Sequence, residues 1–166
     1  EIIRADQIIA LMAQMLLKQN PGRKVTYNVA CGLAAVEAIK AAGGFPIMTP
    51  TGHALIKPIL RSEKALFGGE FSGHFYFEEF GGAENTDYVM LMFMRLLSQE
   101  KRPLSEIARS VRRYFHSGEI NFRVKDKQQK IDAVLAKYGP SAILTTIDGI
   151  RLDSPYLLLS LRTSNT

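Results

Sequence analysis

The sequence predicts an α/β fold, in which a three-layer domain built on a mixed, mostly parallel sheet precedes a small α+β C-terminal domain. Helix-like and strand-like apolar patterns alternate through the first part of the chain, which is typical of a largely parallel sheet. After residue 112 the pattern changes to helices followed by short strands and turns. The length of 166 residues, with 46% hydrophobic and 22% charged residues, fits a globular protein of one or two domains. We therefore expect an α/β domain at residues 1–112 and an α+β domain at residues 113–166.

In the first domain, helices are indicated by apolar residues that recur every three or four positions, and strands by short alternating or continuous apolar runs. Asp6 caps the first helix, and Asn20-Pro21-Gly22 ends it. The methionines and leucines of residues 86–99 indicate core packing rather than a metal or cofactor site. The expected helices are residues 6–19, 32–42, 54–61, 86–99 and 104–114, and the expected strands are residues 24–29, 45–48, 65–69 and 74–77.

In the second domain, we expect a strand, a helix and then three short strands joined by turns. Turn residues separate these last strands, at Ile147-Asp148 and around Pro155. The pair Asp148-Gly149 is typical of a two-residue hairpin turn, so we interpret it as structural. The expected elements are a strand at residues 118–124, a helix at 126–137 and strands at 143–146, 149–152 and 156–161.

The net charge of +5 is compatible with an anionic partner but does not identify it. The basic clusters at residues 109–113 and 125–130 are interrupted by uncharged or acidic residues, and no recognised nucleic-acid motif is present, so we expect no nucleic-acid partner. No apolar run is long enough to span a bilayer and no signal peptide is visible, so we expect no membrane association and a cytoplasmic location. The single cysteine, Cys31, excludes a disulfide within the chain and is expected to be buried.

The most informative stretch is residues 68–77, in which polar side chains and glycines alternate with aromatics. Glu70, Ser72 and His74 occupy every second position at the end of an apolar strand. A carboxylate accepts hydrogen bonds, a hydroxyl donates and accepts them, and an imidazole exchanges protons near neutral pH. Glycines also let the backbone approach a ligand closely. This pattern suits a polyol ligand, and a polar turn between two strands is the alternative.

Two further segments carry candidate binding groups. Thr51-Gly52-His53 precedes a helix, where backbone amides and the helix dipole favour an anion; the alternative is that Thr51 caps the helix and His53 packs. We expect Lys57 to face solvent or form a salt bridge rather than bind phosphate. Residues 162–166 begin with an arginine, whose fork binds a phosphate through two parallel hydrogen bonds, and a polar terminus is the alternative.

These motifs together resemble the alpha-D-phosphohexomutase family of phosphomannomutases and phosphoglucomutases. Residues 69–74 resemble the family's sugar-recognition loop, residues 51–57 its Thr-Gly-His…Ile-Lys element, and residues 162–166 its Arg-x-Ser-Asn-Thr phosphate loop. The matches lie in the family's order and cover nearly the whole chain. The resemblance implies the end of domain 2 at residues 1–4, then all of domain 3 and most of domain 4, with the N-terminal domains of the same protein as partners.

The resemblance also implies the role of each motif. Glu70 and Ser72 would hold two adjacent ring hydroxyls of a hexose, and His74 would transfer a proton or contact phosphate. The same loop would accept a substrate in either of two orientations. The implied substrate-binding residues are Thr51, Gly52, His53, Glu70, Ser72 and His74, and the implied phosphate-binding residues are Arg162, Ser164, Asn165 and Thr166.

The family interconverts hexose 1-phosphate and hexose 6-phosphate through a bisphosphorylated sugar, by phosphoryl transfer from a phosphoserine. The resemblance implies this isomerase activity in carbohydrate metabolism, with hexose phosphate and hexose bisphosphate as ligands. The family's serine and its Mg²⁺-binding aspartates belong to earlier domains, and neither Ser-His-Asn-Pro nor Asp-Gly-Asp-x-Asp occurs in this sequence. We therefore expect no metal site in this chain, weak binding of phosphosugar by the chain alone, if any, and no turnover.

Two departures and two alternatives accompany the resemblance. The position at which family members often carry a lysine is Ala30 here, and residues 81–87 diverge from the family's usual aromatic and Asp-rich stretch. Phosphoglucosamine mutase is disfavoured because its loop usually has glutamine where this chain has Phe71. A non-catalytic phosphosugar-binding module stays open, as does the preference between mannose and glucose.

Overall fold

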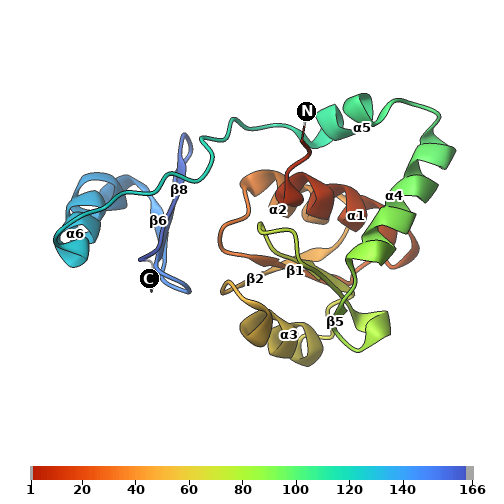
Figure 1. Ribbon diagram of the computed structural model, residues 1–166, viewed down its shortest axis with the longest axis horizontal. Helices are drawn as coiled ribbons and strands as arrows, with labels where there is room; N and C mark the ends of the chain where they lie inside the picture. The colour runs from red at the N-terminus through yellow and green to blue at the C-terminus, as the bar shows by residue number, and fades with distance from the viewer. Residues whose placement is uncertain (1, 164–166) are drawn as a thin grey trace. The chain divides into compact units, whose positions relative to one another are not determined.

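The computed structural model describes residues 2–163, and the chain divides into two compact units, Glu1–Tyr114 and a second unit that begins at Phe115. The first unit has a five-stranded mixed sheet with helices on both faces, and the second has a three-stranded antiparallel sheet with one α-helix (Figure 1). The fold class expected from the sequence is confirmed. None of the helices in residues 2–163 is long and apolar enough to cross a membrane.

The sheet of the first unit combines parallel crossovers with a terminal hairpin. Its strand order is β2 (Phe45–Thr49), β1 (Lys24–Asn28), β3 (Phe67–Gly69), β4 (Phe75–Phe77) and β5 (Ala83–Glu84). Strand β1 pairs in parallel with both β2 and β3, whereas β3–β4 and β4–β5 are antiparallel. The carboxyl ends of the three parallel strands therefore share one edge of the sheet.

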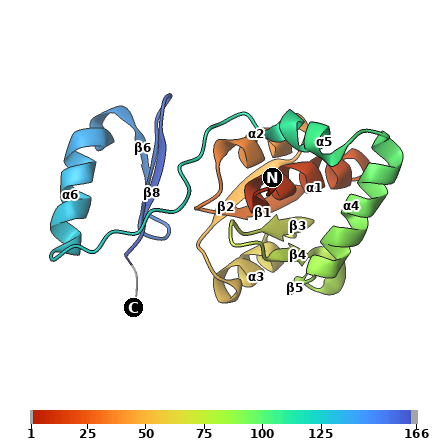
Figure 2. The ribbon, with the colours of Figure 1, turned by 45° about the horizontal axis from the view of Figure 1, so that its top comes forward.

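Helices cover both faces of this sheet (Figures 1 and 2). Helices α1 (Ala5–Gln19), α2 (Leu33–Ala41) and α4 (Thr86–Glu100) pack on one face, and α3 (His53–Ser62) packs on the other. Helix α5 (Leu104–Val111) packs against α1, α2 and α4 through a small apolar cluster of its own. The sheet, α2 and α5 enclose α1. Its buried side chains therefore cover more of the helix surface than the single apolar face that its spacing predicted.

The pleat of the strands divides the core between the two faces. One set of side chains, together with α1, α2 and α4, forms the main core, and it includes Val25, Tyr27, Phe67, Phe75 and Phe77. The residues between them point to the α3 face, where Tyr76 packs with Ile56, Leu60 and Ala65. A polar side chain that continues β3 in the same alternation, such as Glu70, therefore lies on the α3 side.

The second unit is a small hairpin sheet with a helix. It contains α6 (Lys127–Tyr138), η2 (Gly139–Ser141), β6 (Ile143–Thr145), β7 (Ile150–Asp153) and β8 (Leu158–Leu161), with all strand pairs antiparallel. The side chain of Asp126 accepts a hydrogen bond from the backbone N–H of Gln129 at 2.9 Å and so caps α6.

The strand expected at residues 118–124 does not form, and the helix expected to reach residue 114 ends at Val111. Residues 112–126 contain neither helix nor strand, and the alternating apolar side chains of Ile120 and Phe122 are 59% and 75% exposed. A strand requires backbone hydrogen bonds from a neighbour, and within residues 2–163 no strand pairs with this segment. The alternation alone therefore misled the prediction.

The glycine pair at the end of β3 serves packing. A Cβ at Gly68 would lie 2.2 Å from Thr26 Oγ1, on the directly paired residue of β1, and a Cβ at Gly69 would lie 2.5 Å from Ile9 Cγ1 of α1. Both neighbouring side chains are fully buried and have no room to withdraw. These glycines, which we expected to admit a ligand, instead let β1, β3 and α1 approach one another.

This packing yields a stability prediction. Gly68→Ala is expected to lower the free energy of unfolding of the first unit by about 1–3 kcal/mol, because the added methyl group overpacks a filled interior. Urea denaturation followed by circular dichroism measures the change. Gly139→Ala is the control, since its new Cβ would meet no atom within 4 Å and lies in the second unit. Equal stability of Gly68→Ala and the parent chain would contradict the packing role.

Candidate functional site

Two of the three sequence motifs meet at the carboxyl edge of the parallel strands. The loop after β2 contains Thr51 and Gly52, and the loop after β3 contains Glu70, Ser72 and His74. Strands β2, β1 and β3 run parallel, so these loops emerge on the same edge, which is where ligands bind in open α/β sheets.

Glu70 joins the two loops directly. Its Oε1 accepts a hydrogen bond from the backbone N–H of Gly52 at 2.5 Å, and its Oε2 accepts one from the Tyr76 hydroxyl at 2.6 Å. The side chain is 1% exposed, so both carboxylate oxygens are turned into the protein. A buried carboxylate keeps its charge only when donors replace the water that it has lost. The structure thus gives Glu70 protein donors where the sequence analysis expected ring hydroxyls.

The bond to Gly52 also completes the start of α3. Gly52 is the N-cap residue, it has φ +116°, and no side chain of its own caps the helix. Only glycine adopts this backbone conformation without strain. Glu70 takes the place of the acidic residue that, in a capping box, would bind the N-cap amide from within the helix. A negative charge at this end of the helix also interacts favourably with the helix dipole.

The loop after β3 is a tight turn that presents two polar side chains. The N–H of Glu70 donates to the carbonyl of His74 at 2.9 Å, and the N–H of Gly73 donates to the carbonyl of Glu70 at 3.0 Å. Gly73 has φ +93°, which again favours glycine. The turn leaves Ser72 and His74 exposed, and His53 at the start of α3 is exposed as well. These side chains, unlike Glu70, are available to a ligand.

His74 has a carboxylate partner. Its Nδ1 lies 2.8 Å from Oε1 of Glu84, a residue of β5, and the imidazole is 50% exposed. This contact fixes the orientation of the half-exposed ring and leaves its other face accessible to a ligand. The sequence analysis did not find Glu84, because it lies ten residues from His74 on a strand of only two residues.

Asn28 is a second residue that the sequence analysis missed. It ends β1, and its amide Nδ2 donates to Thr51 Oγ1 at 3.2 Å while its Oδ1 accepts from the N–H of Phe71 at 3.0 Å and from the Cys31 thiol at 3.1 Å. The side chain is 1% exposed. One buried amide therefore links the loops after all three parallel strands. The sequence did contain a signal for Asn28, since it is a polar residue at the end of an apolar strand.

Lys57 is partly exposed. Its Nζ also lies 5.5 Å from the centroid of the Tyr76 ring, in a cation–π contact that the sequence did not indicate. Tyr76 itself is fully buried. Burial, followed by the hydrogen bond to Glu70, raises the pKa of Tyr76 above its ordinary value of 10.0.

The third motif lies in the second unit and is only partly described. Arg162 is exposed, and its Nη1 lies 3.4 Å from Oδ2 of Asp148. Gly149 has φ +76°, and a Cβ there would lie 2.2 Å from the carbonyl oxygen of Leu161, so the Asp148-Gly149 turn packs directly on the end of β8. Ser164, Asn165 and Thr166 lie outside the described residues.

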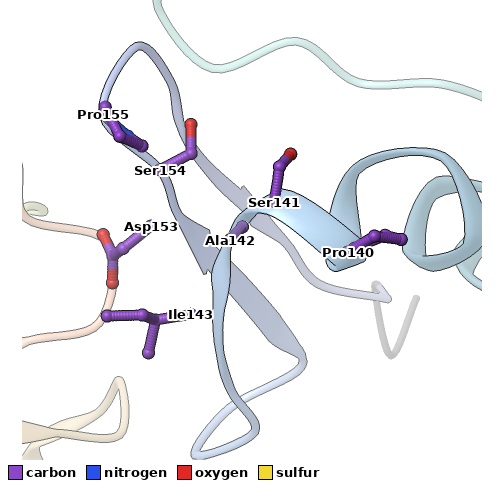
Figure 3. Close-up of a pocket in the computed structure, with 7 residues that line it drawn as sticks. All are labelled: Pro140, Ser141, Ala142, Ile143, Asp153, Ser154 and Pro155. Carbon is purple, nitrogen blue, oxygen red and sulfur yellow. The ribbon is translucent and has the colours of Figure 1, made fainter.

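An open hollow of about 620 Å³ in the second unit does not involve any predicted site residue. Figure 3 shows its lining side chains, which are Pro140, Ser141, Ala142, Ile143, Asp153, Ser154 and Pro155. Its one charged group, Asp153, accepts hydrogen bonds from Nε of the buried Arg151 at 3.1 and 3.0 Å. The hollow has a neutralised carboxylate and little else to hold a ligand.

The described residues do not fit a metal site. Across residues 2–163, no three side chains of histidine, cysteine, aspartate or glutamate gather closely enough to hold an ion.

The raised pKa of Tyr76 predicts a loss of stability at alkaline pH. Above pH 10 the unfolded chain releases this proton and the folded chain keeps it, so the free energy of unfolding falls as the pH rises. The slope contributed by one proton is at most about 1.4 kcal/mol per pH unit. Urea denaturation between pH 9 and about 11 should show a shallower decline in Tyr76→Phe than in the parent chain. Tyr156→Phe, in which the lost hydroxyl is exposed, is the control, and a decline equally steep in Tyr76→Phe would contradict the prediction.

Comparison with known proteins identifies relatives over the whole chain. The family described as "Phosphoglucomutase/phosphomannomutase, alpha/beta/alpha domain III" matches residues 4–114. A protein of Xanthomonas campestris pv. campestris described as "Phosphohexose mutases" is 38% identical over 166 residues, which are 99% of this chain and 37% of that protein. A phosphomannomutase of Methanocaldococcus jannaschii is 34% identical and covers 99% of this chain and 36% of its own length.

The same relationship holds for a solved structure. The crystal structure of a phosphoglucomutase/phosphomannomutase family protein from Burkholderia thailandensis superposes with a TM-score of 0.74 at 28% identity, over 93% of this chain and 33% of that one. This chain thus spans little more than a third of the length of its curated relatives. The resemblance inferred from the three motifs is confirmed: the chain belongs to the phosphoglucomutase/phosphomannomutase family, as part of its C-terminal portion, and residues 4–114 correspond to the family's α/β/α domain III.

Proposed function

We propose that the chain forms the sugar- and phosphate-binding portion of a phosphohexomutase that interconverts hexose 1-phosphate and hexose 6-phosphate, of mannose or glucose, through a bisphosphorylated sugar. The observation that supports this most is the hydrogen bond from the Gly52 amide to Glu70, because it joins two motifs that are separated in sequence. These two motifs carry three exposed polar side chains: His53, Ser72 and His74.

In this proposal the exposed side chains bind the sugar. The Ser72 hydroxyl donates to and accepts from ring hydroxyls, and the imidazoles of His53 and His74 contact hydroxyl or phosphate oxygens. Glu70 anchors the turn that carries His53, since both of its oxygens already accept protein donors. The direct contact between Glu70 and ring hydroxyls implied by the family resemblance stays a prediction.

The phosphate would be held by the second unit. Arg162 is exposed, and its single described carboxylate contact is long, at 3.4 Å, so its guanidinium has donors to offer a phosphate. A guanidinium binds phosphate through two parallel charge-assisted hydrogen bonds. Ser164, Asn165 and Thr166 remain predicted partners of the same phosphate.

In this proposal His74, which is paired with Glu84, is the acid–base group of the site. The imidazole, oriented by the neighbouring carboxylate, would contact a phosphate oxygen or exchange a proton with a hydroxyl oxygen. The phosphoserine, the Mg²⁺ ion and its ligands belong, in this proposal, to other domains of the intact protein. A cytoplasmic location, where sugar phosphates would be substrates, is part of the same proposal.

Ligand titration tests the proposed site. Mannose 1-phosphate and glucose 1-phosphate, added to the ¹⁵N-labelled chain, are expected to shift the amide resonances of residues 51–53 and 70–74 and those near Arg162. Inorganic phosphate and unphosphorylated mannose are the matched controls, and each should shift fewer of these resonances. Shifts confined to other surfaces, or reproduced in full by inorganic phosphate, would contradict a hexose phosphate site.

Arg162→Ala is expected to weaken binding of mannose 1-phosphate by about 1.5–3 kcal/mol, the usual value of a hydrogen bond to a charged group. Isothermal titration calorimetry measures this loss. Arg123→Ala removes another exposed arginine of the second unit and should leave the affinity unchanged. Equal affinities of all three proteins would show that Arg162 does not bind the phosphate.

A mutase assay tests where the chemistry resides. The 166-residue chain is expected to give no conversion of mannose 1-phosphate to mannose 6-phosphate, because it carries neither the Ser-His-Asn-Pro nor the Asp-Gly-Asp-x-Asp motif. Turnover by the purified chain would mean that its own residues donate the phosphoryl group.

A further inference from the structure

We propose that Tyr76 is a positioning residue that couples the two loops of the site, by holding Glu70 against Gly52, the N-cap residue of α3. The inference rests on the proposed function and adds to it a residue that none of the motifs contains. Tyr76 is the central residue of β4 and is fully buried, so its role is exerted through other residues.

The first coupling runs through hydrogen bonds. The Tyr76 hydroxyl donates to Oε2 of Glu70 at 2.6 Å, and Oε1 of Glu70 accepts the Gly52 amide at 2.5 Å. The phenol, the carboxylate and the amide thus form a chain from β4 to the N-cap of α3. Hydrogen bonds in such a chain polarise and strengthen one another, especially where water is excluded.

The second coupling runs through the ring. Lys57, one turn beyond the start of α3, places its Nζ 5.5 Å from the centroid of the Tyr76 ring. The ring also packs with Ile56 and Leu60 of the same helix. Tyr76 therefore contacts α3 along its first turns by its ring and fixes the start of the helix by its hydroxyl. Together with Asn28, Tyr76 thereby holds the loop that precedes His53 and the loop that contains Ser72.

Loss of the hydroxyl would break the first coupling and spare the second. In Tyr76→Phe the ring keeps its packing and its cation–π contact, while Glu70 loses one of two donors in a dry environment. The carboxylate would then turn toward water or toward the Lys57 ammonium, and its bond to the Gly52 amide would weaken. The backbone around Gly52 would become the first part of the site to loosen.

Amide hydrogen exchange of the ¹⁵N-labelled chain tests this inference without any ligand. In the parent chain the Gly52 amide should be protected, and in Tyr76→Phe it should exchange about tenfold faster or more, with an upfield proton shift. Tyr88→Phe is the matched control, since the Tyr88 hydroxyl also interacts with a carboxylate, Glu79, but lies outside the two loops. Tyr88→Phe should leave the Gly52 amide unchanged.

Several results would overturn the inference. One is a Gly52 amide that is unaltered in Tyr76→Phe, and another is a change as large in Tyr88→Phe. If Tyr76→Phe does not fold, the parent chain still decides: a Gly52 amide that exchanges at the rate of an unprotected amide in an unfolded peptide would exclude the coupling. Glu70→Gln, which keeps the shape of the side chain and removes its charge, should also speed exchange at Gly52, and the absence of any effect would count against the proposal.

Binding separates this inference from the proposed function. Mannose 1-phosphate should bind Tyr76→Phe about tenfold more weakly than the parent chain, a difference of about 1.4 kcal/mol. If the parent chain does not bind the sugar phosphate, the proposed function fails while the Gly52 exchange still tests the coupling. Equal affinity of parent chain and variant would overturn the positioning role.

Discussion

The burial of the Glu70 carboxylate is the constraint on which the organisation of this site depends. A carboxylate that is 1% exposed must find donors inside the protein, and here one comes from the backbone of Gly52 and the other from the phenol of Tyr76. Because these donors lie on α3 and β4, satisfying one charge fixes the loop after β2 relative to the hairpin of β3 and β4. The left-handed backbone of Gly52 and the tight turn at Gly73 both fit this arrangement.

The site divides into a buried layer that sets geometry and an exposed layer that carries chemistry. Asn28, Glu70 and Tyr76 belong to the first layer, since each is almost completely buried and contacts residues of other loops or strands. The exposed layer consists of His53, Ser72 and His74, of which His74 is paired with Glu84. Exposed side chains that rest on a rigid, buried support keep fixed directions, which any specific polar recognition requires. The carboxyl edge of a parallel sheet is where open α/β folds commonly place such a site.

Much of the fold follows from periodicity in the sequence. The helices of the first unit and its parallel strands were predicted to within a few residues, because each has a continuous apolar pattern of the appropriate period. The strand expected at residues 118–124 has the same kind of pattern and does not form among the described residues. Alternation shows which side chains lie on one face of a strand, but only a neighbouring strand supplies the backbone hydrogen bonds that make it one.

The sequence by itself determined the family, through three short motifs in a fixed order, and it predicted which residue types the candidate site would contain. The tertiary structure decided which of them are exposed and which are buried. It assigned Glu70 to the interior, Lys57 to the Tyr76 ring and His74 to Glu84, and it added Asn28 and Tyr76 to the site. These partners lie up to 43 residues apart in the chain. Hydrogen-bond partners of this kind are set by strand order and register, which bring distant residues together and which local sequence patterns do not encode.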